Sequence, residues 1–149
     1  MYAHILIATD GSEVAGRALD HGLRLAETVG AKVTVVTVTE PAAVIGAGYA
    51  SVAGTMIDPV PQLIEAVEAG ARVLLEQASA VAKAAGVAFT TTLVPDSYPA
   101  EGIVATAASV GADLIVMGSH GRRGLSRIML GSQTSNVLTH TKIPVLVTR

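Results

Sequence analysis

The stretch HILIATDGS, residues 4–12, indicates the fold class of this chain. Its first six residues form a short apolar run, which is typical of a buried β-strand. The three residues that follow, Asp10, Gly11 and Ser12, predict a turn and the start of a helix, for which Ser12 can supply the cap. Apolar residues then recur every three or four positions over residues 15–29, as the buried face of a helix requires.

Strand and helix patterns alternate through the rest of the sequence. Further strands are predicted at 32–38, 87–94, 114–117 and 143–147, and further helices at 63–85, 99–110 and 132–140. Such alternation favours a parallel sheet with right-handed crossovers and helices on both faces. We therefore expect one doubly wound α/β domain over residues 1–149, with a five-stranded parallel sheet.

Two segments qualify this outline. Residues 41–58 combine glycines and prolines with an almost uncharged composition, which predicts a mobile flap or an irregular excursion. The long helix at 63–85 is expected to bury one stripe of side chains. That stripe consists of Leu63, Val67, Gly70, Leu74, Ala78, Val81 and Ala85.

Composition excludes several classes of protein. The 149 residues contain no cysteine, which rules out disulfides, zinc–thiolate sites and thiol nucleophiles. A net charge of −2 and only four aromatic residues argue against nucleic-acid binding. Because the sequence lacks a basic, apolar leader and any span suited to a membrane, we expect a cytoplasmic protein with neither nucleic acid nor membrane as a partner.

The charges are unevenly placed along the chain. Residues 1–113 contain all 12 acidic residues, whereas residues 114–149 contain five of the 10 basic residues and no acid. A local positive field in the last third of the chain favours a small anionic ligand there. The alternative is that the arginines only solvate a surface loop, and charge alone does not decide between the two.

Glycines lie where such a ligand would bind. In a doubly wound sheet, ligands bind beyond the carboxyl ends of the strands, where the strand order reverses. Asp10, Val38 and the loop GSHGRRG at 118–124 follow predicted strands, and Gly131-Ser132 begins the last helix. Glycine lets backbone N–H groups approach an anion, and a helix N-terminus adds unpaired donors. The sequence thus predicts a phosphate cradle.

Each of these residues also has a purely structural interpretation. The loop glycines can be ordinary turn residues, Ser132 can be only a helix cap, and Asp10 can compete with Ser12 to cap the first helix. The remaining residues, all of which can simply be solvated in a loop, are His120, Arg122, Arg123 and Arg127. The four histidines lack metal-ligand spacing.

Common catalytic signatures are absent. The sequence has no Walker A motif, no Gly-x-Gly-x-x-Gly after the first strand and no Gly-x-Ser-x-Gly elbow. These absences argue against a P-loop motor, a dinucleotide-dependent dehydrogenase and an α/β-hydrolase.

The spacing Gly118-x2-Gly121-x9-Gly131-Ser132 resembles the nucleotide-binding signature of the universal stress protein family. The resemblance extends over the whole chain, from the strand and turn at 5–12 to the terminal strand at 143–147. It implies the fold shared by universal stress proteins and adenine-nucleotide alpha hydrolases. Since every element of the signature is present, it also implies the branch of the family that binds ATP.

The resemblance assigns roles residue by residue. Asp10 would contact the nucleoside, the Val38 backbone would meet the adenine, and the remaining residues would line the base pocket or hold ribose and phosphates. These remaining residues are Ala8, Thr9, Met117, Gly118, His120, Gly121, Arg122, Gly131, Ser132, Gln133 and Thr134. Gln133 stands where a small aliphatic residue is expected, and a side chain that intruded there would weaken phosphate binding.

The leading hypothesis is an ATP-binding regulatory protein of the stress response, with Mg²⁺ on the phosphates and at most slow hydrolysis. No acid follows Asp113, so the sequence offers no convincing carboxylate to position water. The alternative hypothesis is a nucleotide-independent dimeric interaction module with a vestigial site, and a true ATPase is a third. The resemblance further implies a homodimer paired through the strand at 143–148.

Overall fold

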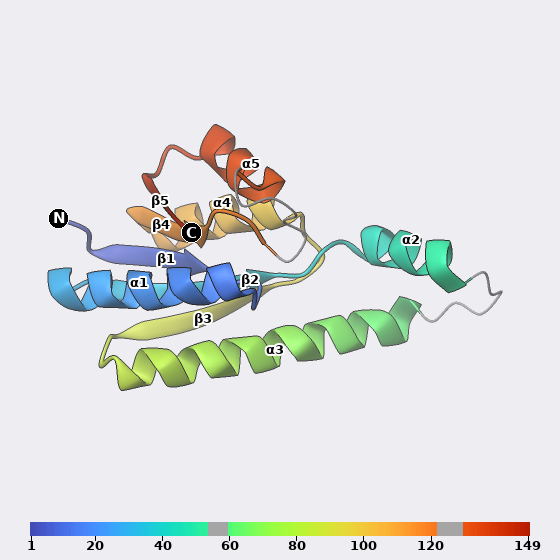
Figure 1. The fold of residues 1–149 in the computed structure, drawn as a ribbon, viewed down its shortest axis with the longest axis horizontal. Coiled ribbons are helices and arrows are strands. Elements are labelled where there is room, and N and C mark those ends of the chain that lie inside the picture. The colour runs from blue at the N-terminus through green and yellow to red at the C-terminus, as the bar shows by residue number, and fades with distance from the viewer. Residues whose placement is uncertain (54–59, 122–129) are drawn as a thin grey trace.

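The computed structural model describes residues 1–53, 60–121 and 130–149 (Figure 1). Along the chain, the elements are β1 His4–Ala8, α1 Glu13–Val29, β2 Lys32–Val38, α2 Ala42–Ala53, α3 Val60–Ala84, β3 Phe89–Val94, α4 Pro99–Val110, β4 Leu114–Gly118, α5 Ser132–His140 and β5 Val145–Thr148. Every predicted strand is present, although β3 and β5 each begin two residues later than expected.

The five strands form one parallel sheet in the order β3-β2-β1-β4-β5. The predicted α/β fold is therefore confirmed. β1 lies at the centre, between β2 and β4, and the strand order reverses there. β3, which contains the predicted edge sequence Thr90–Thr92, is at one edge of the sheet, and β5 is at the other.

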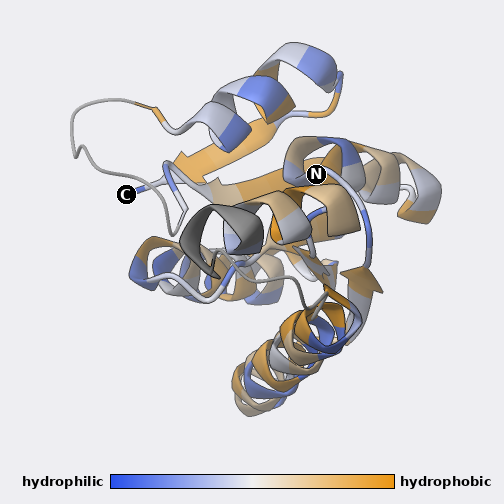
Figure 2. Cartoon of the chain, turned by 90° about the vertical axis from the view of Figure 1, so that its right-hand side faces the viewer, coloured by the Kyte–Doolittle hydropathy of each residue, from blue (hydrophilic) through white to orange (hydrophobic). Residues whose placement is uncertain are grey.

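Helices cover both faces of the sheet. Ile5 and Ile7 of β1 pack into one core with α1 and α3, whereas Leu6 and Ala8 pack into a second core with α4 and α5. The alternation follows from the two-residue period of a strand. Each fully buried Ile or Leu contributes roughly 1.5–3 kcal/mol. Figure 2 shows the hydrophobic strands enclosed between helices with mixed surfaces.

The turn after β1 resolves the competition for the cap of α1. Ser12 is the N-cap, and its Oγ accepts a hydrogen bond of 3.2 Å from the Ala15 N–H. Asp10 instead accepts a 2.9 Å bond from the Ser12 N–H and shapes the turn. Gly11 has a φ of 77°, a left-handed conformation that glycine adopts without strain.

Residues 42–53 form helix α2, so the prediction of an irregular excursion is wrong for them. Residues 54–59 lie outside the described residues. The start of α2 is stabilised by Asp96 Oδ1, which accepts a 3.0 Å hydrogen bond from the Ala42 N–H. Gly46 also lies close to Val60 of α3, since a Cβ on Gly46 would lie 3.2 Å from Val60 Cγ2. Both stabilising contacts come from residues that are distant in sequence.

The predicted buried stripe of α3 is confirmed at Ala78 and wrong at Gly70 and Val81, which are exposed, and its other members are half-buried. The buried residues of this helix are Ala71, Leu75, Ala78 and Ala82, and only Ala78 belongs to the predicted stripe. Val81, which was expected inside, is 45% exposed. The fully buried face of α3 thus consists of three alanines and one leucine, while the larger Val81 lies outside it.

A polar network closes the amino end of the sheet. His4 Nδ1 lies 3.0 Å from the Val110 carbonyl oxygen, which can only accept, so Nδ1 carries the proton and donates. His4 Nε2, 2.8 Å from Thr34 Oγ1, then accepts from this hydroxyl. Burial lowers the pKa of His4, and the charge of Lys32 lowers it further. The folded protein therefore favours a neutral ring.

The same end of the sheet contains Asp113, whose carboxylate accepts hydrogen bonds from the Ala3 and His4 N–H groups at 2.8 and 3.1 Å. The bond from Ala3 is the main cause of a lowered pKa of Asp113. This carboxylate thus stabilises the fold above its ordinary pKa of 3.8, and the stabilisation is lost as the pH falls below that value.

We predict that stability falls as the pH decreases from 7.5 through 6.5, the ordinary histidine pKa. Below 6.5 the unfolded chain takes up a proton at His4 that the folded chain resists, so acid favours unfolding. In His4→Gln, the free energy of unfolding should depend less steeply on pH between 7.5 and 5. Urea denaturation at several pH values measures both slopes, and equal slopes would contradict a neutral buried His4.

Candidate functional site

Three segments that are distant in sequence meet beyond the carboxyl ends of β1 and β4. They are the turn at Asp10, the loop that follows β4, and the start of α5. The Gly131 N–H donates a 2.7 Å hydrogen bond to the Ser119 carbonyl oxygen, which joins α5 to the loop. A Cβ on Gly121 would lie 2.5 Å from Asp10 Oδ2, so the loop also contacts the turn.

The three signature glycines are required by space rather than by backbone angle. Gly118, Gly121 and Gly131 all lack a positive φ. A Cβ on Gly118 would lie 2.8 Å from Val14 Cγ1, and one on Gly131 would lie 2.9 Å from His120 Cα. Contacts under 3.0 Å force a neighbour to move, so a side chain at Gly131 would displace the His120 backbone and one at Gly118 would displace Val14, whereas one at Gly121 would displace only the end of the Asp10 side chain. None of the three therefore needs glycine for a left-handed backbone conformation.

The start of α5 presents backbone donors. Gly131 is the N-cap and has no side-chain cap, so the interpretation of Ser132 as the cap is wrong, and Ser132 is instead the first helical residue. The N–H groups of Ser132, Gln133 and Thr134 come before the first intrahelical bond, which runs from the Ser135 N–H to the Gly131 oxygen. Such donors and the helix dipole favour an anion. The Gly131 N–H is already used within the protein.

The side chain of Thr134 has a structural role. Thr134 is 2% exposed, and its hydroxyl donates a 2.9 Å hydrogen bond to the Gly118 carbonyl oxygen. This bond fixes the first turn of α5 against the end of β4. Only the backbone N–H of Thr134 remains for a ligand. The sequence placed Thr134 in the site but did not indicate this division of roles.

Gln133 is directed away from the cradle. Its Oε1 accepts a 3.2 Å hydrogen bond from the Ala100 N–H in the first turn of α4. The side chain therefore does not intrude between the loop after β4 and α5, which was the concern raised by its size.

The residues assigned to the base pocket lie mainly in the core. Ala8 and Met117 are buried in the core beneath α4 and α5, and Val38 packs against it. A Cβ on Gly102 of α4 would lie 2.9 Å from Val38 Cγ2, so α4 closely covers the end of β2. Thr9 is buried in the turn, and its Oγ1 accepts from the Gly11 N–H at 3.4 Å.

His120 is part of the loop after β4. Its Nδ1 lies 3.1 Å from Ser119 Oγ, a contact that orients the ring. His120 is half-buried rather than fully solvated. Arg122, Arg123 and Arg127, which were predicted to contact either phosphate or solvent, lie outside the described residues.

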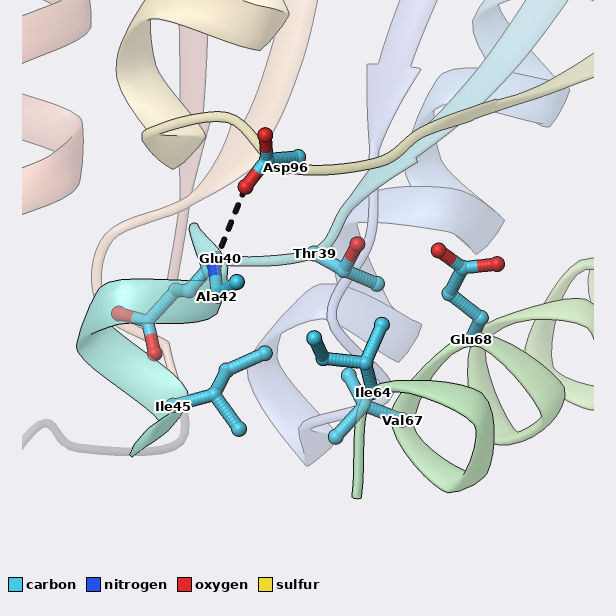
Figure 3. Close-up of a pocket in the computed structure, with 8 residues that line it drawn as sticks. All are labelled: Thr39, Glu40, Ala42, Ile45, Ile64, Val67, Glu68 and Asp96. Atoms are coloured by element: carbon cyan, nitrogen blue, oxygen red, sulfur yellow. Dashed lines mark hydrogen bonds between the residues drawn. The ribbon is translucent and has the colours of Figure 1, made fainter. Parts of the chain in front are cut away.

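A separate hollow of about 240 Å³ lies between α2 and α3 (Figure 3). Ile45, Ile64 and Val67 supply apolar surface, and the other lining residues are Thr39, Glu40, Ala42, Glu68 and Asp96. Its three acidic side chains would repel phosphate. Sequence reasoning did not anticipate this hollow, because α2 was not expected to be a helix.

The described residues lack two features that would indicate other functions. Among residues 1–53, 60–121 and 130–149, no group of three or more His, Cys, Asp or Glu side chains is placed to hold a metal ion. Within the same ranges, no helix combines the length and the apolar composition needed to cross a membrane.

Comparisons with known proteins agree with this architecture. The profile of the Universal stress protein family matches residues 1–149. A universal stress protein of Methanocaldococcus jannaschii is 33% identical over 149 residues, which cover 100% of this chain and 83% of the relative. A second protein of that archaeon, the hypothetical protein MJ0577, has a solved structure with a TM-score of 0.81 and 31% identity, over 99% of this chain and 96% of that one.

A solved universal stress protein in complex with cAMP is 29% identical and has a TM-score of 0.67. The match covers 99% of this chain and 97% of that chain.

We predict that Gly131→Ala is destabilising by about 1–3 kcal/mol, because the new methyl group collides with the His120 backbone. Gly16→Ala is the matched control. Gly16 is an exposed position within α1 where a Cβ would meet nothing within 4 Å, so the change should stabilise the protein by about 0.5–1 kcal/mol. Urea denaturation gives both values. Equal effects of the two substitutions would refute the close contact.

Proposed function

Because this chain belongs to the universal stress protein family, we propose that it is an ATP-binding regulatory protein of the stress response. The nucleotide would lie beyond the carboxyl ends of β1 and β4, with its phosphates at the start of α5. The observation that carries this proposal is the junction of Gly131 with Ser119 and His120. Through this junction, the free N–H groups at the start of α5 lie beside the loop after β4.

The proposed contacts divide into a phosphate end and a base end. At the phosphate end, the donors would be the backbone N–H groups of residues 132–134 and the exposed Ser132 hydroxyl, with Gly118, His120, Gly121 and Arg122 around the ribose and phosphates. At the base end, Asp10 and the Val38 backbone would contact the nucleoside, beside Ala8, Thr9 and Met117. The relative solved with cAMP supports adenine nucleotides as the ligand class.

Mg²⁺ would arrive with the nucleotide. The described residues include no cluster of carboxylates that could form a protein cage for the ion. Mg²⁺ is commonly held by substrate phosphates and water, which suits this arrangement. When bound, the ion would neutralise phosphate charge.

Rapid hydrolysis is not expected. Phosphoryl transfer requires a group that orients the attacking water and charge stabilisation that acts in the transition state. The sequence contains no acid after Asp113, and Asp10 would lie at the base end. The backbone donors at α5 can bind phosphate in the ground state without lowering the barrier. The proposed role is therefore to bind and release nucleotide, with at most slow turnover.

We predict that Ser132→Glu weakens ATP binding at least about tenfold, because it adds a negative charge where the phosphates would lie. The fold should be preserved, since an acidic side chain in the first turn of a helix is favourable. Adenosine, which has no phosphate, should bind both proteins equally. Isothermal titration with ATP, ADP, AMP, GTP and adenosine measures these affinities.

Thr139→Glu is the control for added charge. Thr139 is exposed on the same helix, two turns after Ser132, or roughly 10 Å away. At physiological salt, a charge at this distance is largely screened, and ATP affinity should change little. If the unmodified protein binds no adenine nucleotide at millimolar concentration, the proposed function fails. The alternative, an interaction module with a vestigial site, would then be favoured.

We further propose that β5 pairs with β5 of a second copy to form a homodimer. The carbonyl oxygens of Pro144 and Thr148 accept from Ile115 and Ser119, so alternate residues of β5 face β4. Val145 and Val147 therefore direct their backbone N–H and C=O groups to the open edge. An unpaired edge of this kind favours pairing with another strand.

Val147→Pro should give a folded monomer, because it removes an N–H from the open edge and leaves the bonds to β4 intact. Leu146→Pro is the contrasting variant, since its N–H faces β4 and its loss should destabilise the fold. Light scattering after size exclusion gives the mass of each. A monomeric unmodified protein, or a dimeric Val147→Pro, would rule out this interface.

A further inference from the structure

Gln133 connects the starts of two helices. It is the second residue of α5, and its Oε1 accepts a hydrogen bond from the Ala100 N–H, the second residue of α4. The first residues of α4 need such an acceptor, because Tyr98 occupies the N-cap position without a side-chain cap and Pro99 has no N–H. A residue of α5 thus does for α4 what a local cap normally does.

The two helices are also joined through the core. Ala100, Ile103 and Ala107 of α4 pack with Val137 of α5 in one buried cluster. That contact fixes how the helices lie side by side. Val137 is one turn further along α5 than Gln133, so the bond at Ala100 adds a second restraint, at the end of α5 where the free N–H groups lie.

The start of α4 is in turn tied to the base end of the proposed site. The Ser97 N–H, just before α4, donates a 3.0 Å hydrogen bond to the Thr39 carbonyl oxygen, directly after β2. Gly102 of α4 lies against Val38. The contacts of Gln133 therefore link the phosphate end with the strand whose backbone would meet the adenine.

We propose that Gln133 is a positioning residue for the phosphates of the bound nucleotide. This inference rests on the proposed function. By accepting from Ala100, Gln133 holds the first turn of α5 in the orientation that directs the N–H groups of residues 132–134 toward the phosphates. Because adenosine has no phosphate, Gln133 raises the affinity for ATP and leaves the affinity for adenosine unchanged.

A neutral acceptor suits this position. A carboxamide can bond to Ala100 without adding charge to the start of α5. A glutamate would make the same bond more strongly, because its carboxylate is ionised, but it would place a negative charge in the turn that receives the phosphates. Glutamine and glutamate have nearly the same shape. A comparison of the two therefore separates the structural role of position 133 from its effect on ligand binding.

The test compares Gln133→Ala and Gln133→Glu with the unmodified protein in titrations with ATP and adenosine. For Gln133→Ala we expect about a three- to tenfold loss of ATP affinity, the equivalent of one hydrogen bond, with adenosine affinity unchanged. For Gln133→Glu we expect a larger loss of ATP affinity, together with stability at least equal to that of the unmodified protein. Gln77→Ala, at an exposed site on α3, should change neither affinity.

Hydrogen exchange of the Ala100 amide gives a second readout. If Gln133 couples α4 to the phosphates, ATP should slow this exchange in the unmodified protein, adenosine should not, and Gln133→Ala should abolish the difference.

The outcomes are distinguishable. If the unmodified protein binds ATP but Gln133→Ala lowers only stability and leaves the ratio of ATP to adenosine affinity unchanged, Gln133 merely caps α4 and the inference is overturned. Unweakened ATP binding by Gln133→Glu would show that the first turn of α5 does not lie beside the phosphates, and would overturn the inference as well. If the unmodified protein binds no adenine nucleotide, the proposed function fails and the inference fails with it.

Discussion

The bond from the Gly131 N–H to the Ser119 carbonyl oxygen is the contact on which the candidate site depends. It brings the start of α5 against the loop after β4. Thr134 adds a second bond, to Gly118, on the buried side of the same turn. Together with the bond of Gln133 to Ala100, these two bonds orient the backbone donors at the start of α5.

Glycine is needed at this junction because backbone meets backbone there. The nearest atoms that a side chain at Gly131 would meet belong to His120 and Ser119. The position of Gly131 in the sequence therefore marks a close contact between the start of α5 and the loop after β4. Because the Gly131 N–H is used in this contact, the backbone donors proposed for phosphate are those of the next three residues, at the start of α5.

Local patterns in the sequence predicted the strands, the capping of α1 by Ser12 and the meeting of Asp10 with the glycine loop, because these follow from short-range periodicity and from the topology of parallel sheets. The family resemblance is confirmed over the whole chain. Helix α2 was missed because Asp96, which stabilises its start, is 54 positions away. The fully buried face of α3, which is mostly alanine, was predicted only at Ala78, and the bond of Gln133 to Ala100 has no local signal in the sequence.

The polar network of His4, Thr34 and Asp113 lies at the amino end of the sheet, opposite the candidate site. The protein thus separates the groups that make its stability sensitive to acid from those proposed to recognise a ligand. Acidification can loosen one end of the molecule while the charge of the other end is governed by different residues. Protonation of His4 would therefore act on the end of the sheet opposite the start of α5, without adding charge beside the proposed phosphate donors.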